Sequence, residues 1–258
     1  MTKTTPALLA GLAALPLLGA AAVSGLRAQE EAPVIAPDRA ATEAIVREYL
    51  LANPEVVVEA LERWRDLQDL AAASQAEDGA LAALPALLSG EAGFAMGADA
   101  DEAEVLVAEF FDYHCGYCRR ATDFVFGLAG EDGVRVVFQD LPILREESRG
   151  AALAALAAAE ADAYPAMHRQ LMRTGGVLDE DAVRKAARRA DATRAAGDEA
   201  ALARAADKLE ASIGMARAMG LEGTPTFVVA DPEGRLVRVV PAYDPDAVRT
   251  AIAEVRAL

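Results

Sequence analysis

Cysteine, histidine, aromatic residues and positive charge are all scarce in this chain of 258 residues. It contains two cysteines, two histidines and 5% aromatic residues, and its 25 Lys and Arg are outnumbered by 41 Asp and Glu, which gives a net charge of −16. Binding to nucleic acid or anionic lipid without sequence preference depends on clustered positive charge, so this composition excludes both as main functions. We therefore expect no nucleic-acid partner. Apolar residues make up 53% of the chain, enough to bury a full core.

The N-terminus has the pattern of a secretory signal peptide. Lys3 precedes an uncharged run, Pro6 to Leu26, which ends in small residues before Ala28-Gln29. We therefore expect residues 1–28 to direct export and then to be removed. The uncharged run is also long enough to span a bilayer, so an uncleaved membrane anchor is the alternative interpretation.

The two cysteines, Cys115 and Cys118, form a C-x-x-C pair within FFDYHCGYCRR. Disulfides persist in exported proteins, but one that closes so short a loop restricts the unfolded chain little. Chemistry therefore explains the pair better than stability does. A strand pattern precedes the pair and a helical pattern follows it, which predicts an exposed Cys115 just ahead of a helix and Cys118 on its buried face. The thiolate of Cys115 should then lie beside the free N–H groups and the positive dipole end of that helix.

A metal site is the main competing interpretation of the cysteine pair. A closed zinc site needs four ligands, and only His114 and His168 remain as candidates, about 50 residues apart. We expect no metal and no other cofactor. The sequence around His168 is typical of a solvated helix face, and we expect Met215 and Met219 to belong to the core rather than to bind copper.

The order of the periodic patterns predicts an α/β fold. A buried strand from Val105 to Phe111, a helix after Cys115 and a strand from Val134 to Phe138 form a βαβ unit, which implies parallel strands. The elements expected after it are an Ala-rich series of helices between Arg145 and Gly220, broken near Pro165, Gly175-Gly176 and Gly197, two strands at Thr226 to Val229 and Leu236 to Val240, and a last helix from Asp244 to Ala257.

Two helical patterns precede this unit. The first runs from an N-cap at Asp38 to Ala52, and Asn53-Pro54 ends it and begins the second. A third short helical turn is expected within Ala80 to Leu88, with its length limited by Pro85.

The second helical pattern carries an apolar stripe. Its members fall at helical spacings: Val57, Leu61, Trp64 and Ala71. A complete catalytic domain does not need such a stripe, and an exposed one indicates an interface. We therefore predict that residues 29–90 form an arm that joins copies of this chain into a homo-oligomer. The alternative is that the arm packs against its own catalytic domain.

The cysteine segment and later motifs resemble the DsbA family. VAEFFDYHCGYC, the second strand, the long helical insertion and GTPTFVV before the last ββα elements agree with its thioredoxin fold in order and spacing, over about residues 94–258. Helices ahead of a CGYC centre are similar to the ScsC-type members of that family. The resemblance implies an α/β thioredoxin fold, βαβ–ββα with a helical insertion at about 146–219, in a catalytic domain over 91–258 that follows the arm.

The resemblance also implies roles for particular residues. Cys115 matches the family's nucleophile, Cys118 its resolving cysteine, and Thr224-Pro225 the threonine and cis-proline that bind substrate. Glu109 matches the buried acid of these proteins. Burial raises the pKa of a carboxyl group, which suits proton exchange with the thiol of Cys118. An acid at a strand edge that reaches water is the alternative for Glu109.

The implied activity is thiol:disulfide exchange in the periplasm, on cysteines of exported proteins. A CGYC centre with an oligomerising arm favours an isomerase or reductase, because disulfide shuffling needs a reduced nucleophile. A DsbA-like dithiol oxidase shares every residue named above and remains an alternative, as does a copper-binding or copper-tolerance protein that uses the same thiolates. A membrane redox protein is the expected partner that sets the state of the cysteines.

Overall fold

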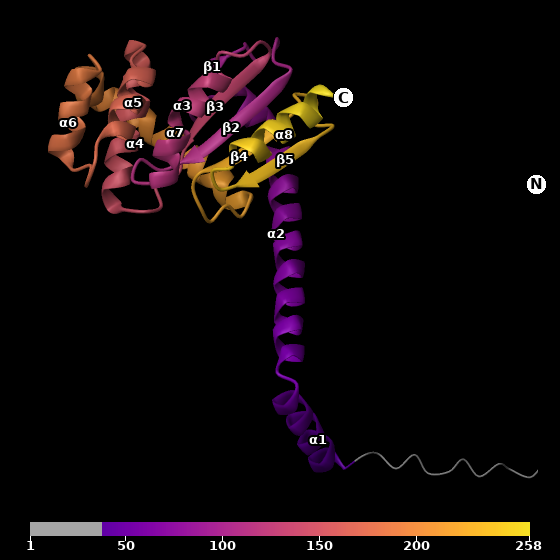
Figure 1. The fold of residues 1–258 in the computed structure, drawn as a ribbon. Coiled ribbons are helices and arrows are strands. Elements are labelled where there is room, and N and C mark those ends of the chain that lie inside the picture. Colours follow the sequence, from indigo (N-terminus) through magenta and orange to yellow (C-terminus); the bar gives the residue numbers. More distant parts are fainter. Residues whose placement is uncertain (1–37) are drawn as a thin grey trace, which may run out of the picture. The chain divides into compact units, whose positions relative to one another are not determined.

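A computed structural model describes residues 38–258 (Figure 1). The predicted signal peptide and the first residues of the predicted arm lie outside the described residues. Residues up to Val58 belong to one compact unit, and residues from Glu59 to Leu258 belong to a second. Among the helices of residues 38–258, none is both long and apolar enough to cross a membrane.

The helices and strands follow the predicted order closely. The helices of the described chain are α1 (Arg39–Ala52), α2 (Glu55–Ser89), α3 (Gly116–Leu128), α4 (Glu146–Ala158), α5 (Tyr164–Arg173), α6 (Glu180–Arg189), α7 (Glu199–Ala218) and α8 (Pro245–Arg256), with 3-10 turns η1 (Ala159–Ala161) and η2 (Ala195–Gly197). The strands are β1 (Phe94–Gly97), β2 (Val105–Phe111), β3 (Val134–Asp140), β4 (Thr226–Ala230) and β5 (Val237–Pro241).

The five strands form one sheet in the order β1-β3-β2-β4-β5. β2 pairs with β3 in parallel, as the βαβ pattern predicts, and the other three pairs are antiparallel. Every residue of β2 is buried, which explains its continuous apolar run. β1 was not predicted, because the four residues Phe94–Gly97 are too few to show a strand period.

Two different layers cover the sheet. The α3 face, to which β2 contributes Val105, Val107 and Phe111, packs with α3, α5 and α8. The α2 face, to which β2 contributes Leu106, Ala108 and Phe110, packs with α7 and the last turns of α2. Side chains of a strand alternate between these faces, so the parity of each position decides which layer it meets.

The end of α2 is fixed to the sheet. Its buried residues share one side of the helix: Ala76, Ala80, Leu84 and Leu87. The guanidinium of Arg135 on β3 donates to the carbonyl oxygens of Leu88, at 2.8 Å, and Ser89, at 3.3 Å. A cation beside the last carbonyls of a helix also interacts favourably with its dipole.

The structure corrects the prediction of a separate short helix within Ala80 to Leu88, limited by Pro85. α2 continues through this proline to Ser89 as one helix of 35 residues. A proline inside a helix removes one backbone hydrogen bond and costs about 3 kcal/mol. Burial of Leu84 and Leu87 on either side of Pro85 contributes about 1.5–3 kcal/mol each, which offsets that cost.

Candidate active site

The cysteine pair lies at the N-terminus of α3, directly after β2. Cys115 is the N-cap residue, and its Sγ accepts a hydrogen bond from the backbone N–H of Cys118 at 3.4 Å. The same Sγ lies 3.1 Å from the carbonyl oxygen of Thr224, to which the thiol donates. The two segments that meet here are 109 positions apart in the chain.

Burial of the two cysteines differs in part from expectation. Cys118 is fully buried on the inner side of α3 with Ala121 and Val125, as predicted. Cys115 is only 4% exposed, so the prediction of an exposed residue is wrong. The segment at Thr224 lies against its Sγ and removes access that the position ahead of a helix alone would leave open.

The environment separates the pKa values of the two thiols. The pKa of Cys115 is lowered to about 5, because hydrogen bonding by the Cys118 thiol first, and then by the side chain of Thr224 and the backbone N–H groups of Cys118 and Tyr117, outweighs the effect of burial. The pKa of Cys118 is raised, chiefly by burial. At neutral pH the arrangement therefore favours a thiolate at Cys115 and a neutral thiol at Cys118.

Glu109 points into the α3 face beneath the cysteines. It is 1% exposed, which excludes an acid that reaches water at a strand edge. Burial first, and then the negative charges of Cys115 and Asp140, raise its pKa to about 8. Its Oε1 has no hydrogen-bond partner. A carboxyl with this pKa gains and loses a proton near neutral pH.

A second buried acid, Asp140, lies on the same face, and the sequence analysis missed it. Glu109 pairs with Phe138 in the register of β2 and β3, so Asp140 is its diagonal neighbour. Neither carboxylate oxygen of Asp140 has a partner, and burial raises its pKa well above the usual range. The available signal was an acid at the end of a mainly apolar strand, VRVVFQD.

His168 belongs to this buried polar region, which corrects its expected place on a solvated helix face. It has no exposed surface, and its Nδ1 lies 3.2 Å from the hydroxyl of Tyr113. Burial lowers its pKa to about 3, so the imidazole is neutral. Its place on the inner side of α5 follows from its spacing of four from Tyr164 and three from Leu171, both buried. Met219 is buried in the core, as expected.

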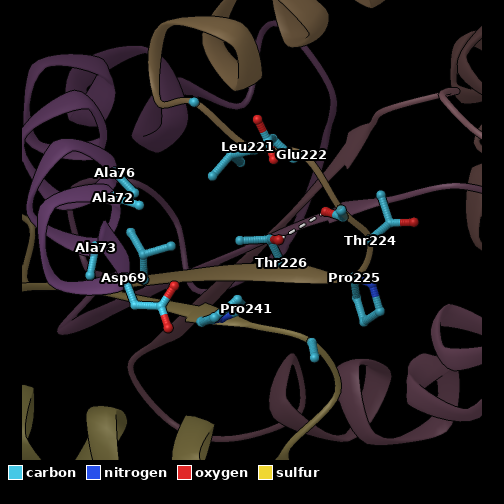
Figure 2. Close-up of a pocket in the computed structure, with 14 residues that line it drawn as sticks. Asp69, Ala72, Ala73, Ala76, Leu221, Glu222, Thr224, Pro225, Thr226 and Pro241 are labelled. Carbon is cyan, nitrogen blue, oxygen red and sulfur yellow. Dashed lines mark hydrogen bonds between the residues drawn. The ribbon is translucent and has the colours of Figure 1, made fainter. Parts of the chain in front are cut away.

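The peptide bond between Thr224 and Pro225 is cis, as predicted. These two residues and Thr226 form one wall of a groove of ≈ 710 Å³ (Figure 2). The opposite wall comes from one side of α2, whose residues fall at spacings of three, four and seven: Asp69, Ala72, Ala73 and Ala76. The sequence analysis did not find this wall, because small residues produce no apolar stripe.

The site has no additional ligands of the kind a metal centre needs. Within residues 38–258, no three His, Cys, Asp or Glu side chains are grouped so that they could hold a metal ion. A thiol pair whose pKa values differ, above a buried carboxyl group, has the groups that thiol–disulfide exchange and proton transfer use.

Comparison with known families agrees with this geometry. The sequence profile of the DSBA-like thioredoxin domain matches residues 106–253, and that of the copper resistance protein ScsC N-terminal domain matches residues 38–69. The chain therefore belongs to the DSBA-like thioredoxin domain family. It is a thiol–disulfide oxidoreductase of the DsbA and ScsC type, with an ScsC-like N-terminal segment.

Solved structures give the same classification. A thioredoxin-like oxidoreductase from Silicibacter pomeroyi DSS-3 is 33% identical, with 67% of this chain and 96% of that chain covered and a TM-score of 0.57. Proteus mirabilis ScsC in a transitional conformation is 26% identical, with 84% and 96% covered and a TM-score of 0.60. Salmonella enterica Typhimurium BcfH, at 24% identity, with 84% and 95% covered and a TM-score of 0.68, shares the fold. Among curated proteins, none matches this sequence.

Proposed function

We propose that this protein is a periplasmic thiol:disulfide oxidoreductase that acts on cysteines of exported proteins, mainly as a disulfide isomerase or reductase. Cys115 is the nucleophile and Cys118 the resolving cysteine. The observation that carries the proposal is the contrast between the two thiols: Cys115, with a pKa of about 5, beside the buried Cys118, whose pKa is raised. Only a thiolate attacks a disulfide, so the first attack falls to Cys115.

The reaction proceeds by thiol–disulfide exchange. The Cys115 thiolate attacks one sulfur of a substrate disulfide, a mixed disulfide forms, and the other substrate sulfur leaves as a thiolate. In isomerisation, that thiolate attacks another disulfide sulfur of the substrate, and a substrate thiolate finally displaces Cys115. In reduction, Cys118 attacks Cys115 and releases the reduced substrate. The protein is then a disulfide, which a dithiol of a membrane redox partner has to reduce.

Proton transfer in the resolving step is assigned to Glu109. The thiol of Cys118 has to lose its proton before it attacks, and burial opposes that loss. With a pKa of about 8, Glu109 in the same buried region is a stronger base than an exposed carboxylate, so it accepts this proton at a lower cost than an ordinary carboxylate would. Thr224 and Pro225 are assigned to substrate binding, because Thr224 contacts the nucleophile and both residues line the groove.

The preference for isomerase activity rests on the arm. Three residues of its stripe are large and exposed within the single chain: Val57 at 41%, Leu61 at 48% and Trp64 at 57%. We propose that the stripe joins copies of the chain and so brings several Cys115 thiols to one substrate, which raises their effective concentration. The domain boundaries proposed with this function are a signal peptide at 1–28, the arm at 29–90 and the catalytic domain at 91–258.

The experiment uses point variants, because deletion of the whole arm also removes Leu84 and Leu87 from the core. In the double variant L61Q/W64Q, light scattering should show a smaller mass than for the wild type. Its isomerase activity on a scrambled disulfide protein should fall, and its oxidase activity should remain. D66Q, on the opposite side of α2, is the matched control. If the wild type is already a monomer, the proposal that the arm joins copies of the chain is wrong.

Thiol trapping in cells separates the isomerase from the oxidase. An isomerase keeps Cys115 and Cys118 reduced at steady state, whereas a DsbA-like oxidase keeps them as a disulfide. The match to a copper resistance protein's N-terminal domain favours copper binding as the second candidate function. Copper(I) titration of the reduced wild type against a C115S/C118S variant tests it. The copper function is supported instead if the wild type binds copper(I), the C115S/C118S variant does not, and the wild type catalyses no disulfide exchange.

A further inference from the structure

His114, directly before the nucleophile, uses both ring nitrogens. Its side chain is 4% exposed. Its Nε2 accepts a hydrogen bond from the backbone N–H of Leu178 at 3.0 Å, and its Nδ1 lies 2.7 Å from Oγ of Ser148. A backbone N–H is only a donor, so Nε2 carries no proton. The imidazole is therefore the neutral Nδ1–H tautomer, which donates to Ser148.

Asp112 completes this hydrogen-bond network. Its Oδ1 accepts from the hydroxyl of Ser148 and from the backbone N–H of His114, both at 2.7 Å. Its Oδ2 accepts from the backbone N–H of Leu144 at 2.9 Å. The network cannot act as a hydrolytic triad, because Ser148 is buried and its hydroxyl proton and the free nitrogen of His114 are both occupied.

The network holds two loops that carry exposed apolar side chains. One is the segment after β3, where Ile143 is 46% and Leu144 is 51% exposed. The other follows α5, where Val177, next to Leu178, is 44% exposed. We call residues 141–145 and 174–179 the two rim loops. Hydrogen bonds to Asp112 and His114 join both rim loops to the turn that precedes Cys115. The backbone N–H of Cys115 itself donates to the carbonyl oxygen of Asp112 at 2.9 Å.

We propose that His114 is a positioning and specificity residue: its neutral imidazole holds the rim loops beside Cys115 for polypeptide substrates, and its protonation releases the loop at Leu178. This inference rests on the proposed function. A protonated ring presents Nε2–H to the N–H of Leu178, and two donors cannot bond to each other. A small disulfide needs only the thiolate, whereas a polypeptide also contacts the rim loops.

The charges around the imidazole keep it neutral at ordinary pH. Asp112 faces it from the end of β2, Arg119 from α3, and Arg145 and Glu147 from the start of α4. Burial first, with Arg145 and Arg119, lowers the pKa of His114 below its usual 6.5, against the opposite effect of Asp112 and Glu147. Release of the loop is therefore a transition on the acid side of the usual pKa of histidine.

The test compares reaction rates of the reduced protein with insulin, a disulfide-linked polypeptide, and with oxidised glutathione, from pH 4 to pH 8. In the wild type, the ratio of the insulin rate to the glutathione rate should fall in acid. In H114Q, whose amide oxygen accepts from Leu178 and does not titrate, the ratio should stay constant. In H114F the ratio should be low at every pH, by about fivefold, the effect of one lost net hydrogen bond.

A second readout reports on the network itself. Nitrogen NMR should show His114 as the Nδ1–H tautomer at neutral pH. The protection of the Leu178 amide, measured relative to its intrinsic exchange rate at each pH, should fall in acid in the wild type but not in H114Q. E147Q should move the acid transition to lower pH. An Nε2–H tautomer, or an H114F ratio equal to that of the wild type, overturns the inference. A wild type that reacts with neither disulfide refutes the proposed function instead.

Discussion

The two faces of the central sheet are equally buried but chemically different. The α2 face is mainly apolar. Its buried polar residues are Arg135, whose guanidinium donates to backbone carbonyls, Gln139, whose side-chain amide has no partner, and Thr226. The α3 face contains two acids, a histidine and two tyrosines, each at most 1% exposed: Glu109, Asp140, His168, Tyr113 and Tyr164. Unpartnered oxygen or nitrogen atoms remain on four of these residues, and each costs about 1–3 kcal/mol.

This difference shows which face supplies stability and which supplies chemistry. Buried acids without partners destabilise a fold, so their grouping beneath Cys118 is more consistent with proton transfer than with packing. The apolar α2 face has no such groups near the thiols and contributes burial of hydrophobic surface. Changes on the two faces should therefore affect different measured quantities.

The largest effect is expected at the thiol end of the α3 face. C115S should abolish disulfide exchange, because serine supplies no thiolate, whereas C118S should still attack and accumulate a mixed disulfide with substrate. Alkylation of the reduced wild type at mildly acidic pH, followed by mass spectrometry, should label Cys115 first, as its pKa of about 5 requires. Preferential labelling of Cys118 contradicts the assignment.

The next largest effect is expected on the α2 face. L87A should lower the free energy of unfolding by about 2–5 kcal/mol, because Leu87 is fully buried between α2 and the sheet. The pKa of Cys115, measured by thiolate absorbance, should not change. L70A, at a position that is 68% exposed on the same helix, should change stability by about 0.5 kcal/mol or less. A changed pKa of Cys115 in L87A would contradict the conclusion that the α2 face affects stability and not the chemistry of the thiols.

E109Q is expected to change how stability depends on pH. The pKa of Glu109 is about 8 in the folded protein and 4.5 as the reference for the unfolded chain. Its folded form thus binds the proton more tightly, and stability is lost as pH rises from about 4.5 to about 8, at up to about 1.4 kcal/mol per pH unit.

E109Q should remove the Glu109 contribution, so that in denaturant titrations the stability of E109Q rises relative to that of the wild type as pH increases across this range, and it should slow the resolving step in stopped-flow measurements. Glu102, an exposed acid, provides the control variant E102Q. An unchanged slope together with an unchanged resolving rate rules out the role of Glu109.

The smallest effect is expected from D140N. The negative charge of Asp140 contributes to the raised pKa of Glu109, so its removal should lower that pKa, by about one unit. The infrared band of the protonated carboxyl group should then titrate at lower pH, and the pH profile of the resolving step should shift in the same direction. A shift to higher pH contradicts the interaction between the two acids.

Much of this molecule could be predicted because its signals are local. The mainly apolar run of β2, the period of 3.6 along α3 and the caps at Asp38 and Asp244 depend on residues within a few positions. The same applies to Cys115 ahead of α3. The errors have two causes. His168 was assigned to water although its own helical spacing places it with Tyr164, a local signal that the prediction did not use. Residues Ala80 to Leu88 were predicted as a separate short helix limited by Pro85, but packing on the sheet lets α2 continue through this proline.

The sequence by itself determined the α/β order of the elements, the cysteine pair and the place of Glu109 within a buried strand, because each follows from periodicity and from residue chemistry along one segment. Only the tertiary structure decided that Thr224 covers Cys115, that Asp140 lies diagonal to Glu109 and that His114 bonds to Leu178. These contacts join residues from different parts of the chain. The pKa values at the site depend on such contacts, and a sequence pattern records none of them.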